Sequence, residues 1–306
     1  MLQNYSCRLI SVMSFPFLFI VLVSFTLYAQ AAHAPRSGYC AVRYPVVLVH
    51  GISFSPNTPA VGYWGTIPRL LRSDGARVYL SGQLVYGSHE ENAAMLKERI
   101  HAVLRESGAQ RVNIIAHSKG GIESRYMISK LGMGPHVASL TTLCSPHRGS
   151  VVADALYREM NSSMNLSFLL AGCATFLSAV SGDHHAAPYI AGAQLSTAYM
   201  TEFNKTVVDD PAVYYQSYAS RINEDYPSPG WASLYLFVYG QAGENDGVVS
   251  VSSARWGEYG GIISAGAFQH LSHSEVVCVA KRPGMDDAVV YGFYRTLVAD
   301  LKSKGF

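Results

Sequence analysis

The sequence predicts an α/β fold, in which helices cover both faces of a mostly parallel central sheet. Apolar stretches of strand length alternate with helix-like stretches between residues 44 and 144, and this alternation is typical of parallel sheets with crossover helices. The first stretch is apolar at consecutive positions, as expected for a strand that is buried on both faces. The chain has 306 residues, 49% of them hydrophobic, which suffices for a large core. We therefore expect a single α/β domain over residues 40–306.

Residues 1–34 have the layout of a secretory signal peptide. A weakly basic start precedes an apolar run over residues 15–28, and small residues follow the run. Cleavage after Ala31 is favoured, because cleavage after Ala34 would leave a proline at the new N-terminus. The alternative is a membrane anchor, but the run is short for a helix that crosses a bilayer. We expect residues 1–31 to be removed and the protein to be secreted or periplasmic.

Local patterns define the first expected elements of the domain. Residues 44–50 read YPVVLVH and predict a strand. Residues 63–75 place apolar side chains at helical spacing before a terminal glycine, which predicts a helix. Residues 77–80 predict a second, short strand.

Residues 88–108 give the clearest helix signal. Ser88 is followed three residues later by Glu91, the pair that forms a capping box at a helix start. Apolar side chains then fall on one face, and Gly108 closes the pattern. A further apolar strand is expected over residues 137–144.

Residues 151–205 interrupt the alternation and predict an insertion. Residues 164–180 are apolar on nearly every side but too few to span a bilayer. They predict either a buried helix, which composition alone favours, or a mobile cap over an apolar substrate slot. The alternation is expected to resume with a strand at 234–239, and a final helix is expected after Pro283.

One stretch, VNIIAHSKGGIESRY from Val112 to Tyr126, predicts a strand, a sharp turn and a helix. A serine hydroxyl is a weak nucleophile unless it is exposed beside a base and beside N–H donors for the oxyanion. Small residues at Ala116 and Gly120 leave room for a strained turn that would expose Ser118 at its tip. The alternative is an ordinary glycine-rich loop without chemistry.

A nucleophilic serine needs a histidine base and a carboxylate that orients it. Asp246 follows the expected strand at 234–239, within an Asn-Asp-Gly turn. By itself this turn is ordinary loop chemistry. Weaker carboxylate candidates, which lack the combination of strand end and turn, are Asp225, Glu224 and Glu244.

Two histidines follow Asp246 in the chain, which gives the order serine, acid, histidine of an α/β-hydrolase triad. His273 is favoured as the base, because it precedes an apolar run and the last helix, and His270 is the alternative. The two oxyanion N–H groups would come from Ile52, after an early strand, and from Lys119, after the serine.

The residues beside these positions also fit the site. Gly51 would let the backbone approach the substrate. His50 and His117 flank the site, and we expect them to shape it rather than to exchange protons.

Several segments together resemble bacterial secreted triacylglycerol lipases with an alanine-type AHSKGG elbow. The segments are VVLVHGI, VNIIAHSKGGIESRYMIS, ASLTTLCSPHRGS, GENDGVVSVSSARWGE and LSHSEVV. The resemblance extends from about residue 44 to residue 277 and is weakest over 155–195. It implies an α/β-hydrolase fold with a helical lid-like insertion at about 151–205. It also implies Ser118 as nucleophile, Asp246 as orienting acid and His273 as base, with Ile52 and Lys119 at the oxyanion positions.

Some related lipases hold a structural calcium ion beside the histidine loop. The resemblance places Glu275 at the position of one ligand, where the family has aspartate, and Asp225 is a second candidate. Carboxylate oxygens suit calcium. No cofactor is expected for the chemistry itself, and a secretion or folding chaperone is a partner that the sequence leaves open.

Four cysteines remain after leader cleavage, and export permits disulfides between them. They are Cys40, Cys144, Cys173 and Cys278. Cys144 lies in an apolar strand-like run and is expected to be a buried thiol, which leaves at most one bridge.

The expected function is that of a secreted serine hydrolase of carboxylic esters, in lipid metabolism, and most specifically a triacylglycerol lipase. The alternatives are a short-chain carboxylesterase, a phospholipase or acyltransferase, and a thioesterase. A binding protein that has the hydrolase fold but no activity is disfavoured, because it would not need all three triad residue types. The net charge of +2 gives no electrostatic reason to expect nucleic-acid binding.

Overall fold

The computed structural model describes residues 37–52, 62–84, 86–160, 192–263, 270–278 and 285–306. Within them, six strands form one sheet in the order β2-β1-β3-β4-β5-β6, and every neighbouring pair is parallel. The expected parallel α/β sheet is therefore confirmed. The strands are β1 (Val46–Val49), β2 (Val78–Leu80), β3 (Val112–His117), β4 (Val137–Leu143), β5 (Tyr214–Ala219) and β6 (Glu258–Ile262).

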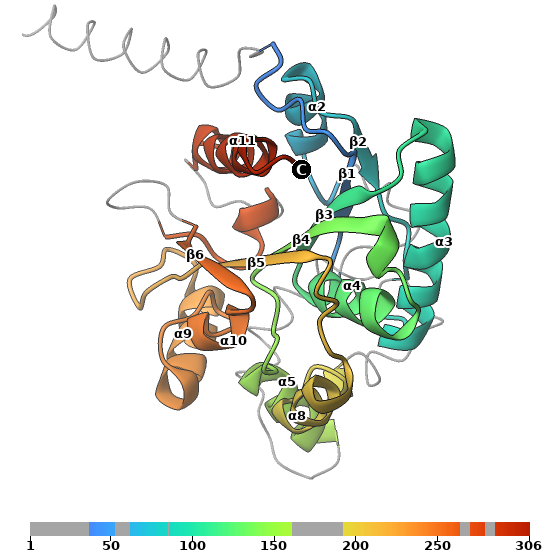
Figure 1. Ribbon diagram of the computed structural model, residues 1–306. Coiled ribbons are helices and arrows are strands. Elements are labelled where there is room, and N and C mark those ends of the chain that lie inside the picture. Colours follow the sequence, from blue (N-terminus) through green and yellow to red (C-terminus); the bar gives the residue numbers. More distant parts are fainter. Residues whose placement is uncertain (1–36, 53–61, 85, 161–191, 264–269, 279–284) are drawn as a thin grey trace, which may run out of the picture.

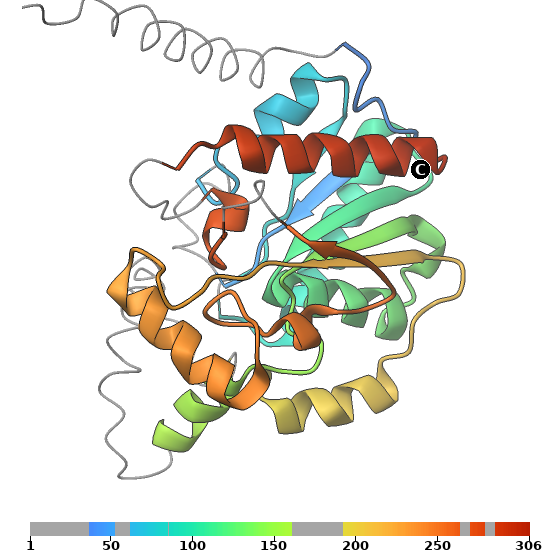
Figure 2. The same cartoon turned by 90° about the vertical axis from the view of Figure 1, so that its left-hand side faces the viewer.

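Helices cover both faces of this sheet (Figure 1). Helices α2 and α11 pack on one face, and α3 and α4 on the other. A second group, α5, α8, α9 and α10, lies on the side of the molecule away from α2 and α11 (Figures 1 and 2). The helices are α2 (Ile67–Ser73), α3 (His89–Ser107), α4 (Lys119–Lys130), α5 (Val151–Met160), α8 (Thr197–Thr206), α9 (Pro229–Ala242), α10 (Val251–Ala254) and α11 (Ala288–Ser303), with short 3₁₀ turns η1 (Gly134–His136) and η2 (Glu275–Val277).

The continuous apolar run of β1 is explained by its two covered faces. Val46 and Leu48 pack with α2 and α11, whereas Val47 and Val49 pack with α3 and α4. Successive strand side chains point to opposite faces, so a strand between two helical layers must be apolar at every position.

The local signals of α3 act as predicted. The side chain of Ser88 accepts the backbone N–H of Glu91, and the Glu91 side chain accepts the backbone N–H of Ser88. Gly108 ends the helix in the left-handed conformation, with φ of 68°. Both ends of α3 are therefore determined by residues next to them in the sequence, Ser88 with Glu91 at the start and Gly108 at the end.

The strand expected at residues 234–239 is wrong, because these residues lie inside helix α9. Trp231, Leu234 and Val238 are buried at helical spacing and pack with α5. The stretch is apolar on all sides, so its sequence carries no clear period. Strand β5 lies beside β4 in the sheet, and β6 lies beside β5. Sequence reasoning missed both strands, because β5 contains glutamine and serine and β6 contains two glycines.

Two expectations lie outside the described residues, the signal peptide at 1–34 and the apolar stretch at 164–180. In the part of the chain that the structure describes, no helix is both long and apolar enough to cross a membrane. The final helix, expected after Pro283, is α11, with Asp287 at its N-cap.

Candidate active site

Ser118 stands at a strained turn between β3 and α4. Its backbone adopts φ of 55° and ψ of −132°, a conformation that side-chain-bearing residues rarely adopt. Its N–H donates to the carbonyl of Leu143 on the neighbouring strand, at 2.9 Å. The turn is closely surrounded, since a Cβ on Gly120 would lie 2.4 Å from the carbonyl oxygen of His50. The local geometry is that of a nucleophile elbow, as the sequence predicts.

The structure brings Ser118, His273 and Asp246 together at the carboxyl ends of the strands. His273 Nε2 lies 2.9 Å from Ser118 Oγ, and His273 Nδ1 lies 2.7 Å from Asp246 Oδ2. All three residues are almost completely buried. His273, and not His270, occupies this position. The arrangement allows the imidazole to accept the serine proton while the carboxylate orients the ring.

Asp246 is itself fixed by the turn that carries it. Its Oδ1 accepts the backbone N–H groups of Val248 and Val249, at 2.9 and 2.7 Å. Its carbonyl oxygen accepts the backbone N–H of His273, at 3.0 Å. One carboxylate oxygen is therefore occupied by the turn, and the other faces the imidazole.

The two predicted oxyanion donors lie on either side of Ser118 in the fold. Lys119 is the first residue of α4, where backbone N–H groups have no partner within the helix. Gly51 and Ile52 follow β1, and a Cβ on Gly51 would lie only 2.6 Å from Ser118 Cβ. The absence of a side chain at Gly51 thus brings this loop directly against the serine.

His117 lies beside the triad, and sequence reasoning missed its partner, Tyr63. The Tyr63 hydroxyl lies 2.5 Å from His117 Nδ1 and accepts the N–H of Gly51 at 3.0 Å. Burial lowers the pKa of His117 well below its ordinary value, so the ring is neutral. Its Nδ1 accepts a hydrogen bond from the Tyr63 hydroxyl. The His117 and His273 rings are 4.6 Å apart. These contacts agree with the expectation that His117 shapes the site.

Cys144 is a buried free thiol, as predicted. Its Sγ lies 3.2 Å from Ser220 Oγ, and burial, then the nearby Asp246, raises the pKa of the thiol well above its ordinary value. The ligating atoms of Cys144, His117 and His273 lie within 4.8 Å of one another. His273 belongs to the triad, so this cluster is part of the same site. Cys173 lies outside the described residues.

The carboxylates that the resemblance assigns to calcium have different environments. Glu275 is fully buried, and its Oε2 accepts the backbone N–H of Ser272 at 2.9 Å. Asp225 is exposed. Neither belongs to a cluster of three or more metal-ligating side chains among the described residues. A calcium ion takes six to eight oxygen ligands, including backbone carbonyls and waters, and the calcium site stays a prediction.

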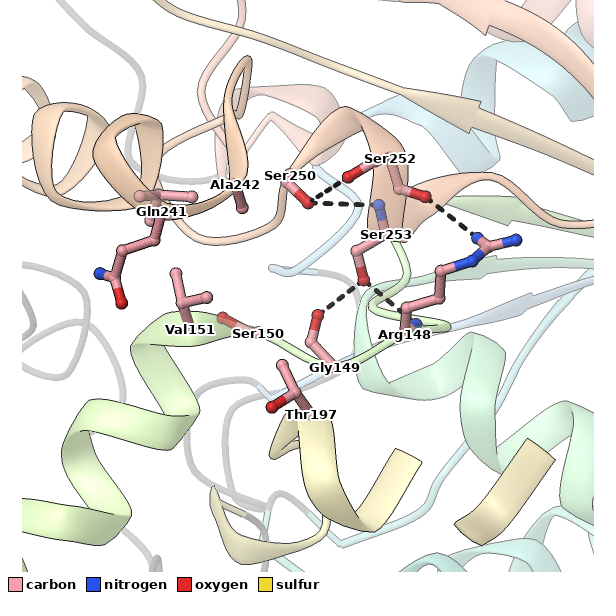
Figure 3. A pocket seen from close by; sticks show the side chains of 11 residues that line it. Arg148, Gly149, Ser150, Val151, Thr197, Gln241, Ala242, Ser250, Ser252 and Ser253 are labelled. Atoms are coloured by element: carbon pink, nitrogen blue, oxygen red, sulfur yellow. Dashed lines mark hydrogen bonds between the residues drawn. The ribbon is translucent and has the colours of Figure 1, made fainter. Parts of the chain in front are cut away.

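A separate pocket of about 230 Å³ opens between α5, α8, α9 and α10 (Figure 3). Ser253 Oγ donates to the carbonyl of Gly149 and accepts the N–H of Arg148 there. The lining includes none of the predicted catalytic residues. The pocket therefore takes no part in the triad geometry.

Comparison with known proteins finds similarity to lipases and thioesterases. A family model described as palmitoyl protein thioesterase matches residues 45–259. Triacylglycerol lipase 2 of Saccharomyces cerevisiae is 27% identical over 82% of this chain and 76% of its own. A triacylglycerol lipase of Vibrio cholerae is 33% identical over 61% of this chain and 63% of its own.

Among solved structures, the mature form of the Bacillus licheniformis lipase BlEst2 has the same fold. The TM-score is 0.60 at 19% identity, over 83% of this chain and 91% of that one. The shared α/β-hydrolase fold places an elbow serine at the carboxyl edge of the sheet.

Proposed function

Because the chain belongs to the palmitoyl protein thioesterase family, we propose that it is an exported serine hydrolase of fatty-acyl esters, and specifically a triacylglycerol lipase. The observation that carries this proposal is the hydrogen-bonded chain from Ser118 through His273 to Asp246, on a strained elbow. The curated relatives named triacylglycerol lipases support the substrate class. The layout of residues 1–31 supports export.

In the proposed mechanism, Ser118 Oγ attacks the ester carbonyl while His273 Nε2 takes its proton. Asp246 holds the imidazole in the tautomer that has its proton on Nδ1. The N–H groups of Ile52 and Lys119 stabilise the oxyanion of the tetrahedral intermediate. His273 then returns the proton to the leaving alcohol, which departs and leaves an acyl-serine. Water, deprotonated by the same imidazole, releases the fatty acid and restores Ser118.

A thioesterase is the second candidate function, and the description of the matching family favours it. The same triad cleaves esters and thioesters, because both reactions pass through an acyl-serine. The two functions differ in the leaving group. An ester and a thioester with the same acyl chain therefore distinguish a lipase from a thioesterase.

The test is hydrolysis of p-nitrophenyl esters from acetate to palmitate, of triolein and of palmitoyl-coenzyme A, by the protein that begins at residue 32. We expect cleavage of long-chain esters, and a loss of about 10³-fold or more in kcat for Ser118→Ala. Ser139→Ala is the matched control, because Ser139 is also buried and bonds Asn113 at the far end of the sheet. Full activity in Ser118→Ala would refute the serine mechanism. A preference for palmitoyl-coenzyme A would favour the thioesterase.

A further inference from the structure

We infer that Gln83 is a positioning residue, which holds the oxyanion loop of residues 50–52 in its active orientation through a buried polar network. This inference rests on the proposed function, since it concerns the aim of the Ile52 N–H at the oxyanion. The network has three further members on α3 and α4, Asn92, Lys119 and Glu123.

Gln83 contacts the oxyanion loop directly. Its Nε2 donates to the carbonyl oxygen of His50 at 2.8 Å and to Glu123 Oε2 at 3.2 Å. The side-chain amide has two N–H groups, and both face acceptors that cannot donate. A flipped amide would place its own oxygen against these two acceptors, so its orientation is fixed.

Glu123 anchors the far side of Gln83. Its carboxylate also accepts Asn92 Nδ2, at 2.6 Å, and the Lys119 ammonium group. Lys119 in turn donates to the carbonyl of Gly87, at 2.7 Å. A buried carboxylate with a cationic partner and two amide donors is a stable anchor, because its charge is compensated.

The peptide unit that joins His50 to Gly51 is held at both ends. Its carbonyl oxygen accepts Gln83 Nε2, and its N–H donates to the Tyr63 hydroxyl at 3.0 Å. Gly51 has no side chain, and such residues allow a peptide unit to rotate most easily. Two opposed hydrogen bonds remove that rotation.

The next peptide unit carries the Ile52 N–H itself. His50 Nδ1 lies 2.8 Å from the carbonyl oxygen of Gly51, which can only accept, so the ring donates. Burial lowers the pKa of His50 below its ordinary value, and the ring is neutral with its proton on Nδ1. The C=O and N–H of one peptide unit point in opposite directions. The ring that holds the Gly51 oxygen therefore sets the direction of the Ile52 N–H, and Gln83 holds the backbone that carries this ring.

Both oxyanion donors are thus tied to one network. The first donor is the backbone N–H of Lys119, and the ammonium group of the same residue donates to the Glu123 carboxylate. The second donor is the N–H of Ile52. The loop that carries it accepts a hydrogen bond from Gln83, and Gln83 also donates to the Glu123 carboxylate. The network keeps the two donors at a fixed separation while the negative charge develops, which is what oxyanion stabilisation requires.

The test compares Gln83→Met with Gln216→Met. Methionine keeps the side-chain length and removes both N–H donors. Gln216 is the matched control, because it is also buried and donates to Thr141 within the sheet, without contact to the oxyanion loop. Active sites are counted by phosphonate titration, so that unfolded protein does not contribute to kcat.

For Gln83→Met we expect kcat to fall about 10- to 100-fold with KM changed less than about threefold, because a misdirected donor costs less than the 10²- to 10³-fold loss of a deleted one. The Ki of a long-chain alkyl boronic acid, which mimics the tetrahedral intermediate, should rise by the same factor. Gln216→Met should change neither value. Wild-type kcat and Ki in Gln83→Met would overturn the inference and leave the proposed function standing.

Crystal structures of wild type and Gln83→Met test the inference independently of activity. We expect the Gly51–Ile52 peptide unit to change its orientation in the variant. An unchanged peptide would overturn the inference. If the wild-type protein cleaved no ester or thioester, the proposed function would fail, and this structural comparison would still decide whether Gln83 fixes the loop.

Discussion

At the scale of single residues, the site depends on places where no side chain fits. Gly51, Gly120 and Gly121 surround the elbow, and a Cβ on each would lie 2.6 Å or less from a neighbouring atom. For Gly51 that atom is Ser118 Cβ, and for Gly121 it is Ser145 Oγ. The backbone at Gly51 can therefore lie directly against the nucleophile, which brings N–H groups within reach of the oxyanion.

Gly51→Ala should disable the enzyme while a matched glycine replacement does not. The added methyl would displace either Ser118 or the oxyanion loop, and a displacement of about 1 Å in a catalytic group can cost about 10²-fold in rate. We expect that loss in kcat. Gly292→Ala on α11 is the control, because its Cβ would meet no atom within 4 Å and alanine stabilises helices by about 0.5–1 kcal/mol. Wild-type kcat in Gly51→Ala would contradict the close approach of the loop.

At the scale of elements, the loop that carries His273 is fastened by hydrogen bonds within the protein. The η2 turn follows His273, and Glu275 accepts the N–H of Ser272 within it. The Tyr294 hydroxyl of α11 donates to the carbonyl of Val276, at 3.1 Å. These bonds hold the loop between the Asp246 turn and the last helix.

Chelation should therefore leave the protein unchanged. We expect the Tm in EGTA to stay within about 1 °C of the Tm in millimolar calcium, since an ion that binds only the folded state would raise it. Glu275→Ala should lower the Tm in both buffers equally, because it leaves the buried Ser272 N–H without this acceptor. A Tm that falls in EGTA and recovers with calcium would establish the calcium site that the lipase resemblance implies.

At the scale of the whole molecule, folding lowers the pKa of four buried histidines in the part of the chain that the structure describes. Burial is the main cause that lowers the pKa of each, and nearby Lys119 or arginine side chains also lower it at three of them, His50, His89 and His147. The four are His50, His89, His117 and His147. The unfolded chain binds protons at these residues below about pH 6.5, whereas the folded chain does not.

Stability should consequently fall as the pH drops below about 6.5. Above that pH the histidines are neutral in both states and contribute no slope. Below about pH 6.5, each of these histidines lowers the free energy of unfolding by up to about 1.4 kcal/mol per pH unit, until the pH reaches the pKa of that histidine in the folded state. Urea unfolding between pH 5 and 8 measures this slope. His89→Gln should reduce it, and His101→Gln, at a partly exposed position of the same helix, should not. A flat profile below pH 6.5 would refute the neutral burial.

The sequence by itself determined the features that depend on near neighbours in the chain. The strand, turn and helix around Ser118 and the capping box of α3 each lie within a short stretch of chain, and each was predictable from local chemistry. The chain order of serine, acid and histidine was enough to nominate the triad, although Asp246 follows helix α9 and not the strand that the sequence predicted before it.

Only the tertiary structure decided the features that depend on distant contacts. Residues 234–239 form part of a helix because α5 offers them a helical packing face, and a stretch that is apolar on all sides takes its period from its surroundings. Tyr63 and Gln83 carry no local signal, yet they hold the two ends of one peptide unit beside Ser118. The hydrogen bonds that aim this loop join the residues after β1 to Tyr63, which precedes α2, and to Gln83, which follows β2, and only the folded sheet brings these segments together.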